Sequence, residues 1–282
     1  MRIGNFDLYS IETSRFALDG GAMFGIVPKT LWEKKITPDE KNRIPMCTRS
    51  LFLVSKYKRI LIDTGNGDKW DDKNRSIYKI DTNSVNINNA LNHLGYTPED
   101  VTDIINTHLH FDHCGGNTRF DNSGKIVPTF PNATYWIQKV NWELATHPTE
   151  KDRASYLANN WEVLMENGMI EFVDGPGEIL PGIKVITSNG HTTGQQHPII
   201  SDGITTVFYC GDIIPTSAHI SVPWVMAYDI LPVTTMEEKK KLLPRMVDES
   251  WTLFFEHDVD CEAVIIGRDG KKVYIKEKFK LE

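Results

Sequence analysis

The sequence predicts an α/β protein built from two sheets with helices packed on their outer faces. Strand-like segments occur near both ends of the chain, whereas segments with helical periodicity lie between them. The 282 residues are 40% hydrophobic and 24% charged, which is typical of ordinary globular proteins. Because the sequence shows neither an internal repeat nor a linker, we expect one domain over residues 1–282.

The first half of the chain predicts a hairpin, a helix and a buried strand in turn. Leu51–Ser55 and Arg59–Asp63 are β-rich runs on either side of a polar turn. Apolar residues recur at helical spacing over residues 87–94, and Gly95 then ends the helix. Ile104-Ile105 is a short buried strand that leads into a histidine-rich segment.

The second half alternates helical and strand-like segments. A helix near Met236–Met246 carries Pro244, which should end or kink it because proline lacks an amide hydrogen. Asp269-Gly270 is a strong hairpin signal between the last two strands. The remaining elements are helices at Lys139–Thr146 and Arg153–Asn167, and strands at Ile183–Thr187, Thr205–Cys210, Ala263–Gly267 and Lys272–Lys276.

Charge and composition bear on partners and location. The formal charge of −7 disfavours nucleic acid, and the basic run Lys239-Lys240-Lys241 is interpreted as a solvated helix face. No apolar run approaches the ~20 residues of a membrane span, and the first residues lack the features of a signal peptide. The four scattered cysteines indicate neither a zinc ribbon nor a disulfide framework. We therefore expect a cytoplasmic protein without membrane contact.

The segment Thr107–Gly116 holds the strongest chemical signal. Three of the nine histidines and an aspartate fall within six of its residues. Residues two apart in an extended segment point the same way, so His108 and His110 can bind one ion. The glycine pair that follows Asp112-His113 signals a turn, which lets this second pair reach a second ion. Imidazole and carboxylate ligands suit zinc, with iron, manganese and cobalt as alternatives.

The cluster His108-x-His110-x-Asp112-His113 resembles the signature of the metallo-β-lactamase superfamily. Four further motifs of that family follow the expected order over about residues 50–260. They are Leu61-Ile62-Asp63-Thr64-Gly65, Gly190-His191-Thr192-Thr193-Gly194, Gly211-Asp212, and His257 within Phe254–Asp258.

This resemblance implies the αββα four-layer sandwich of the metallo-β-lactamase fold and a full ligand set. Asp63 would accept a hydrogen bond and orient the ligands, and Asp112 would also carry the proton to the leaving group. The first metal would be held by His108, His110 and His191, the second by Asp112, His113 and His257, with Asp212 bridging both.

Charge supports two divalent metals, because Asp112 and Asp212 would otherwise repel each other in one pocket. Two such ions make a bridging water ionise near neutral pH, and the resulting hydroxide is the nucleophile. We therefore expect a dinuclear metal-dependent hydrolase acting on a small molecule.

The branch that the sequence most resembles contains N-acyl-homoserine lactonases, which act in quorum quenching, and related phosphotriesterases. The points of similarity are the motif His108–Gly116 with its Asn117 and the compact length. A lactone or related carboxylic ester is the expected substrate. Phosphotriesters and glutathione thioesters are the alternatives, and an iron-dependent oxidoreductase resembling sulfur dioxygenases is the alternative class.

The chain departs from this branch at several positions. Thr193 and Gln195 replace a usual proline and histidine, and Pro215 stands where many lactonases have a tyrosine. Tyr228 and His219, in the following loop, are candidates for that tyrosine's catalytic role. The alternative for both is ordinary packing. Cys114 replaces a small residue and is interpreted as a buried space-filler.

Phe16–Gly25 is too apolar and glycine-rich for a polar loop or a regular strand, and we expect residues 16–36 to form a lid or an interface segment. Met23 and Phe24, with Trp32, would form an apolar wall for the substrate, and Ser221–Met226 would form the opposite wall. Packing in the core, or in the interface of a homodimer, is the alternative.

Overall fold

The structure is a computed structural model that describes residues 1–270 and 272–281. Its contacts divide the chain into two compact units, each built from two separate segments. Unit 1 comprises Met1–Phe16 and Cys47–Gly175, and unit 2 comprises Ala17–Met46 and Pro176–Glu282. Each unit contains its own seven-stranded sheet.

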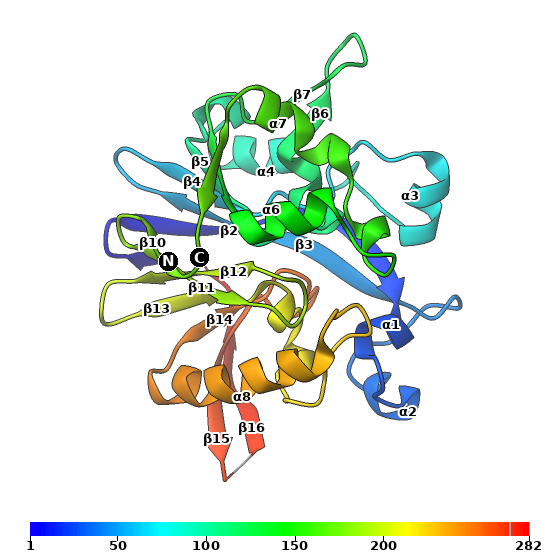
Figure 1. The fold of residues 1–282 in the computed structure, drawn as a ribbon. Helices are drawn as coiled ribbons and strands as arrows, with labels where there is room; N and C mark the ends of the chain where they lie inside the picture. Colours follow the sequence, from blue (N-terminus) through cyan, green and yellow to red (C-terminus); the bar gives the residue numbers. More distant parts are fainter. Residues whose placement is uncertain (271, 282) are drawn as a thin grey trace. The chain divides into compact units, whose positions relative to one another are not determined.

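The sheet of unit 1 has the order β1-β2-β3-β4-β5-β8-β9 (Figure 1). The pair β3 and β4 is antiparallel, as expected for the predicted hairpin, whereas β4, β5, β8 and β9 run parallel to one another. The ends of β2 and β3 extend into unit 2. The strands are β1 (Arg2–Ile3), β2 (Phe6–Asp19), β3 (Arg43–Val54), β4 (Arg59–Ile62), β5 (Asp103–Ile105), β8 (Thr134–Gln138) and β9 (Ile170–Val173).

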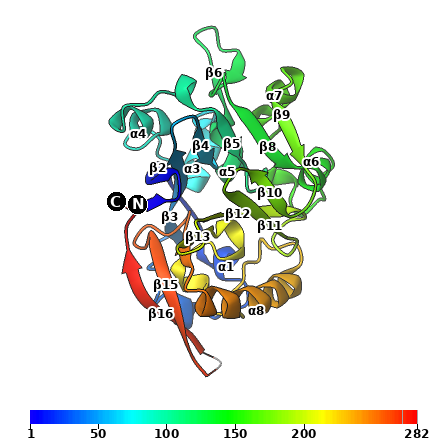
Figure 2. The same cartoon turned by 90° about the vertical axis from the view of Figure 1, so that its left-hand side faces the viewer.

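Helices of unit 1 pack on this sheet through a common apolar core. Leu91 of α4, Ala145 of α6 and Leu164 of α7 share it with strand residues such as Leu61 and Ile104. A small hairpin, β6 (Thr118–Phe120) with β7 (Ile126–Pro128), projects at the top of Figure 2. The helices are α3 (Asp72–Tyr78), α4 (Ile87–His93), α5 (Phe111–Cys114), α6 (Lys139–Thr146) and α7 (Glu162–Glu166), with short 3₁₀ turns η1 (Pro98–Asp100), η2 (Gly115–Asn117), η3 (Arg153–Ser155) and η4 (Ala158–Asn160).

The sheet of unit 2 runs in sequence order from β10 to β16, and only β13 and β14 form a parallel pair within it. Leu243 and Met246 of the long helix α8 share a core with Leu253 and Val264 of the strands. The elements are β10 (Gly177–Leu180), β11 (Ile183–Ser188), β12 (Gln195–Ser201), β13 (Thr206–Tyr209), β14 (Thr252–Phe254), β15 (Ala263–Asp269), β16 (Lys272–Phe279), α1 (Gly20–Phe24), α2 (Lys29–Trp32), α8 (Pro232–Asp248), η5 (Gly211–Ile213) and η6 (Ser217–His219).

Most predicted elements appear close to their expected bounds, but one helix was predicted wrongly and another is longer than predicted. The helix predicted over Arg153–Asn167 is broken into η3, η4 and α7, because Tyr156 and Leu157 adopt an extended backbone conformation. Helix α8 runs past Pro244 to Asp248, so of the two effects predicted for this proline the helix end is excluded, and the kink stays a prediction. Among the described residues, no helix combines the length and apolarity needed to cross a bilayer. The four cysteines are buried, and none of them forms a disulfide within the described residues.

The interpretation of Lys239-Lys240-Lys241 as a wholly solvated face is also wrong. Lys239 is completely buried in unit 2, and its ammonium donates to the carbonyls of His219, Ser221 and Trp224 at 2.6, 2.8 and 2.9 Å. Burial lowers the pKa of Lys239 to about 7. The side chain therefore stabilises the loop between η6 and α8 through hydrogen bonds to three of its carbonyls.

We expect the metal-free protein to lose stability as the pH falls from about 6.5 to about 4. His197 and His219 are wholly buried, and burial lowers the pKa of each imidazole to about 4. An unfolded chain takes up these protons near pH 6.5, so acid favours unfolding across this window. Each histidine contributes a loss of about 3 kcal/mol once the pH is below its folded pKa.

Urea unfolding of the metal-free protein between about pH 7.5 and about pH 4 measures this loss. His197→Gln should flatten the dependence, because glutamine does not titrate. A variant with the same pH dependence as the unaltered chain would contradict the assignment.

Candidate metal centre

In unit 1, the histidine-rich segment follows the carboxyl end of β5. His108 and His110 lie in the loop, and Asp112 and His113 lie in the short helix α5. The ring centroids of His108 and His110 are 4.4 Å apart, and those of His108 and His113 are 4.0 Å apart. Potential ligand atoms of Asp112 and His113 lie within 4.8 Å of each other. All four side chains are buried, so this unit brings the predicted cluster together.

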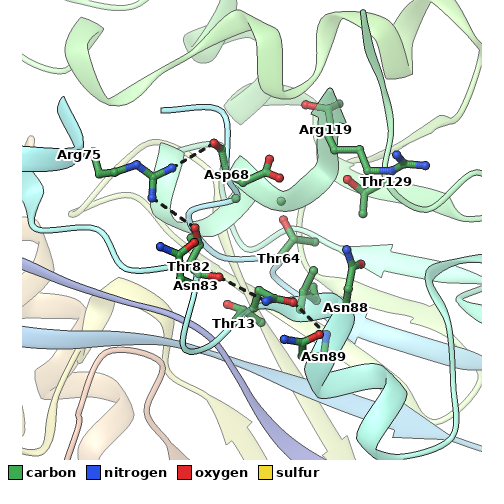
Figure 3. Close-up of a pocket in the computed structure, with 15 residues that line it drawn as sticks. Thr13, Thr64, Asp68, Arg75, Thr82, Asn83, Asn88, Asn89, Arg119 and Thr129 are labelled. Atoms are coloured by element: carbon green, nitrogen blue, oxygen red, sulfur yellow. Dashed lines mark hydrogen bonds between the residues drawn. The ribbon is translucent and has the colours of Figure 1, made fainter. Parts of the chain in front are cut away.

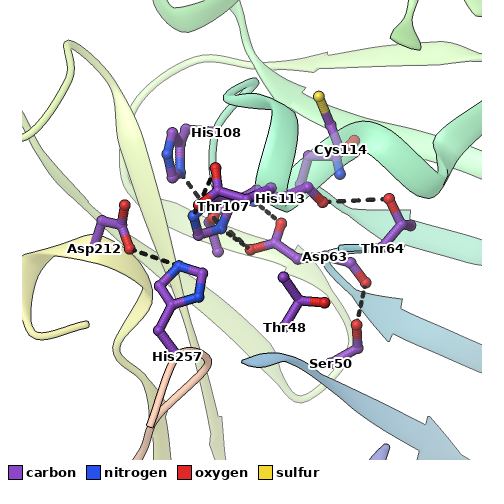
Figure 4. Close-up of polar contacts among 12 residues, drawn as sticks. Thr48, Ser50, Asp63, Thr64, Thr107, His108, His113, Cys114, Asp212 and His257 are labelled. Carbon is purple, nitrogen blue, oxygen red and sulfur yellow. Dashed lines mark hydrogen bonds and ion pairs between the residues drawn. The ribbon is translucent and has the colours of Figure 1, made fainter. Parts of the chain in front are cut away.

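Asp63 holds this segment from the neighbouring strand. Because β4 and β5 are parallel, Asp63 and Thr107 leave the sheet at the same edge. Asp63 Oδ1 accepts from the Thr107 amide at 2.7 Å, and Oδ2 accepts from the Thr107 hydroxyl at 2.6 Å and from His113 Nδ1 at 3.0 Å (Figure 4). Asp63 has a left-handed backbone with φ 55°, which is costly for a residue other than glycine. Such a conformation is typical of functional sites.

These contacts fix the tautomers of two histidines. The Thr107 hydroxyl gives its proton to Asp63 and therefore accepts from His108 Nδ1, 3.1 Å away. A carboxylate can only accept, so His113 Nδ1 also carries a proton. In both rings the lone pair is then on Nε2, which is the state required of a metal-ligating imidazole.

The glycine pair after α5 lets the chain turn tightly. A Cβ atom on Gly116 would lie 2.3 Å from the carbonyl oxygen of Thr64, and one on Gly115 would lie 2.2 Å from that of Asn66. No larger residue could occupy either position without moving the backbone.

Lys69 donates to the carbonyls of Gly115 and Thr118 at 2.6 and 2.7 Å, and burial lowers its pKa to about 8.

In unit 2, three predicted ligands converge at strand ends. Asp212 follows β13 and His257 follows β14, and the two strands are parallel, so both residues leave the sheet at one edge. Asp212 Oδ2 lies 3.1 Å from His191 Nε2, and Oδ1 lies 3.1 Å from His257 Nε2. The two oxygens of one carboxylate thus face two different imidazoles, as Figure 4 shows for His257.

The contacts of His191 require positive charge near Asp212, either on the imidazole ring itself or on a bound metal. His191 Nδ1 donates to Asp229 Oδ1 at 3.0 Å, which leaves the lone pair of a neutral ring on Nε2. That lone pair would face a carboxylate oxygen, and two acceptors at 3.1 Å repel each other unless positive charge compensates. A divalent metal ligated by both atoms would supply that charge.

His219, predicted as a catalytic candidate, has a packing role instead. Its Nε2 donates to the Met23 carbonyl at 2.8 Å, so Nδ1 is the acceptor for the Thr216 hydroxyl at 2.8 Å. Its ring stacks on Phe24 with centroids 4.7 Å apart, and no part of it is exposed. Since both nitrogens are engaged within the core, no donor or acceptor is left for a substrate.

The two predicted apolar walls also pack against each other within unit 2. Phe24 is fully buried, stacks on Trp32 at 5.1 Å and meets Trp224 edge-on at 5.7 Å. The amide of Ala227 donates to the carbonyl of Ala22 at 2.8 Å. These contacts match the alternative of core packing rather than opposite faces of a substrate pocket.

Phe24→Leu is therefore expected to lower the free energy of unfolding by about 2 kcal/mol, because three aromatic contacts are lost. The substitution should not raise KM more for long-acyl substrates than for short-acyl substrates. Urea unfolding and steady-state kinetics measure the two effects, and a selective rise in KM for long acyl chains would restore the wall interpretation.

Three further residues complete the comparison of the predicted site with the structure. Tyr228 lies in the loop before α8 and is about one-third exposed, so its catalytic role stays a prediction. Cys114 is fully buried, its thiol donates to the Leu109 carbonyl at 3.4 Å, and burial raises its pKa, as a space-filler requires. Tyr156, which sequence reasoning missed, places its ring 4.8 Å from that of His110.

Two residues that position ligands were also missed. Thr107 has a hydroxyl directly before the first histidine of the motif, and this was the signal that could have revealed its role. Asp229 lies 38 residues after His191, and nothing in the sequence pattern links the two.

Comparison with known proteins agrees with this site. Residues 47–257 match the family model of the metallo-beta-lactamase superfamily. An N-acyl homoserine lactonase of a Bacillus species is 29% identical over 184 residues, or 64% of this chain and 65% of the relative. The match thus spans slightly less than two thirds of that relative's length.

Solved structures show the same fold over the whole chain. A probable metal-dependent hydrolase from Staphylococcus aureus gives a TM-score of 0.90 at 29% identity, covering 99% of this chain and 98% of that one. A dizinc quorum-quenching lactonase in complex with a product gives 0.79 at 21% identity, covering 99% and 97%. At the lower identity the likeness concerns the fold alone.

Buried imidazoles and carboxylates with fixed tautomers, set at the ends of parallel strands, define a metal-binding protein. The chain belongs to the metallo-beta-lactamase superfamily. The predicted fold class, that of the metallo-β-lactamase fold, is confirmed.

Proposed function

We propose that the chain is a dinuclear metal-dependent hydrolase that opens a lactone or a related carboxylic ester. The observation that carries the dinuclear site is the position of Asp212, whose two oxygens each lie 3.1 Å from the Nε2 atom of a different histidine. A carboxylate in that position is suited to bridge two ions. The proposed ligands are His108, His110 and His191 for one metal, Asp112, His113 and His257 for the other, and Asp212 for both.

The donor set fits divalent metals. Histidine nitrogens and carboxylate oxygens are ligands of zinc, and iron, manganese and cobalt accept the same atoms. The Nδ1 atoms of His113 and His191 donate to Asp63 and Asp229, which orients each ring and makes Nε2 more basic. Zinc is the proposed metal.

When bound, two such metals supply a water that ionises near neutral pH and a Lewis acid for the carbonyl oxygen. The chain's own residues then have distinct tasks. Asp63, through Thr107 and His113, keeps the imidazoles of unit 1 in the ligating tautomer. Asp112 is proposed to pass a proton to the leaving oxygen. It is the carboxylate directly before His113 in the chain, and it is not among the groups that Asp63 contacts.

The substrate class rests on the relatives. Those matched at 28–29% identity are named N-acyl homoserine lactonases, and a lactone is therefore the first candidate. Phosphotriesters and glutathione thioesters are tested beside it. The homodimer, the cytoplasmic location and the absence of nucleic-acid and membrane partners stay predictions of the sequence.

The test is elemental analysis of the purified protein, followed by assays with lactones, phosphotriesters, aryl esters and glutathione thioesters. We expect about two metals per chain and the highest kcat/KM on a lactone. A protein with one iron that consumes oxygen would instead be an oxidoreductase. A protein that cannot be loaded with metal would end the proposal.

His110→Ala should lose metal and reduce kcat/KM by roughly a thousandfold, because the activated water is no longer held. His147→Ala is a matched control, since His147 is exposed at the end of α6 and is not among the proposed ligands. Equal losses in both variants would show that the effect is not specific to the metal centre.

A further inference from the structure

Unit 1 contains a polar cavity of about 420 Å³ that the proposed hydrolysis does not use (Figure 3). Its walls come from the β6–β7 hairpin, the first residues of α4, the turn at Gly116, and helix α3 with the loops on either side of it. We call it the hairpin cavity and define it by Asp68, Arg75, Asn88, Arg119 and Thr129. Its volume lies within the range of small-molecule sites.

Thr129 gives the clearest sign that this cavity binds a ligand. Its side chain is only 3% exposed, and no hydrogen-bond partner for its Oγ1 exists among the residues that the structure describes. Its backbone amide donates to the carbonyl of Asn117 at 2.9 Å, so its position is fixed. A buried hydroxyl without a partner is costly, and a ligand oxygen would remove that cost.

Arg119 lies on the same face of the hairpin as Thr129. Arg119 is paired with Val127, and Thr129 follows two residues later, so the two side chains are diagonal neighbours on one face. Within the described ranges, no carboxylate forms an ion pair with this guanidinium. A guanidinium and a hydroxyl on one face are a suitable pair of donors for an oxyanion.

The other wall offers groups that suit hydroxyls. Arg75 donates to the Thr82 hydroxyl at 3.3 Å and to the Asp68 carbonyl at 3.4 Å, and its charge also helps to lower the pKa of Asp81. The amide of Asn88 and the carboxylate of Asp68 also line the cavity. One acidic and two basic side chains leave a net positive lining in a chain whose formal charge is −7.

We propose that the hairpin cavity binds a small hydroxylated anion of the sugar-phosphate class. The oxyanion accepts from Arg119 and Thr129, and the hydroxyls of the ligand bond to Asn88 and Asp68. This binding is independent of the hydrolysis proposed above, since none of the proposed metal ligands lines the cavity.

Isothermal titration of the metal-loaded protein tests the proposal, with ribose 5-phosphate, inorganic phosphate and ribose as probes. We expect saturable binding of ribose 5-phosphate, at least about tenfold weaker binding of phosphate, and no binding of ribose. Arg119→Gln and Thr129→Val should each weaken the binding of ribose 5-phosphate by about tenfold or more. Arg2→Gln, an exposed arginine outside the cavity, should leave it unchanged.

Three outcomes would overturn the proposal. Ribose 5-phosphate could fail to saturate, phosphate could bind as tightly as the sugar phosphate, or binding could survive both cavity substitutions, which would place the anion at the metal ligands. Thr129→Val should keep the melting temperature of the unaltered chain, because the hydroxyl it removes has no protein partner in the described structure. A loss of binding in that variant therefore reports on the cavity rather than on folding.

Discussion

Asp212→Ala is expected to reduce kcat/KM on the order of ten-thousandfold and to leave the protein with less than one tightly bound metal. Asp212 is the one residue proposed to contact both metals, and its two oxygens face His191 and His257 at the same distance of 3.1 Å. Its removal takes a ligand from each ion and one negative charge from the pair. The effect should therefore exceed that of His110→Ala, which affects one ion.

Metal content by elemental analysis and kcat/KM on a lactone measure this prediction together. Asp248→Ala is the control, because it removes an equal charge from an exposed position with a 3.7 Å contact to Arg268. If Asp212→Ala still bound two metals with unchanged affinity, the bridging role would be wrong even if the rate fell.

Lys239→Met should lower the free energy of unfolding by about 4 kcal/mol. Methionine fills a similar volume but cannot donate to the carbonyls of His219, Ser221 and Trp224, which all lie within 2.9 Å of the ammonium. Buried carbonyls that lose their donor keep the full cost of desolvation. Urea unfolding near neutral pH, with the metal content held equal, measures the change.

The adjacent residue provides a matched control. Lys240 is exposed, and its ammonium pairs with Glu237 at 2.6 Å in water. Lys240→Met should change the free energy of unfolding by less than about 0.5 kcal/mol. Similar effects of the two substitutions would mean that the buried contacts of Lys239 contribute little.

Turn residues and hydrophobic periodicity predicted an element correctly where the tertiary packing favours the same structure. Asp269-Gly270 joins β15 and β16 as expected, and Lys139–Thr146 is helical over the predicted bounds. The periodicity across Arg153–Asn167 was misleading, because Tyr156 and Trp161 turn inward from separate short turns and meet edge-on. Tertiary packing overrides helical propensity in such a segment.

The part of the metal centre in unit 1 could be predicted because its residues are nearly contiguous. The family motifs extended the prediction to His191, Asp212 and His257. Asp229 and the burial of Lys239 could not be predicted, since each depends on a loop whose path no local pattern specifies. Lys239 sits in a basic run of identical residues, and only the fold distinguishes the buried one from the exposed ones.

The division of unit 2 into two segments has a consequence for synthesis. Residues 17–46 emerge from the ribosome well before residues 176–282, which complete the same unit. His219 lies 196 residues beyond Met23, whose carbonyl it contacts. At a synthesis rate of about 5–20 residues per second, Phe24 and Trp32 are therefore made roughly 10 to 40 seconds before the residues that pack against them. During that interval an aromatic segment is exposed on the nascent chain, which makes this protein a candidate for early chaperone capture.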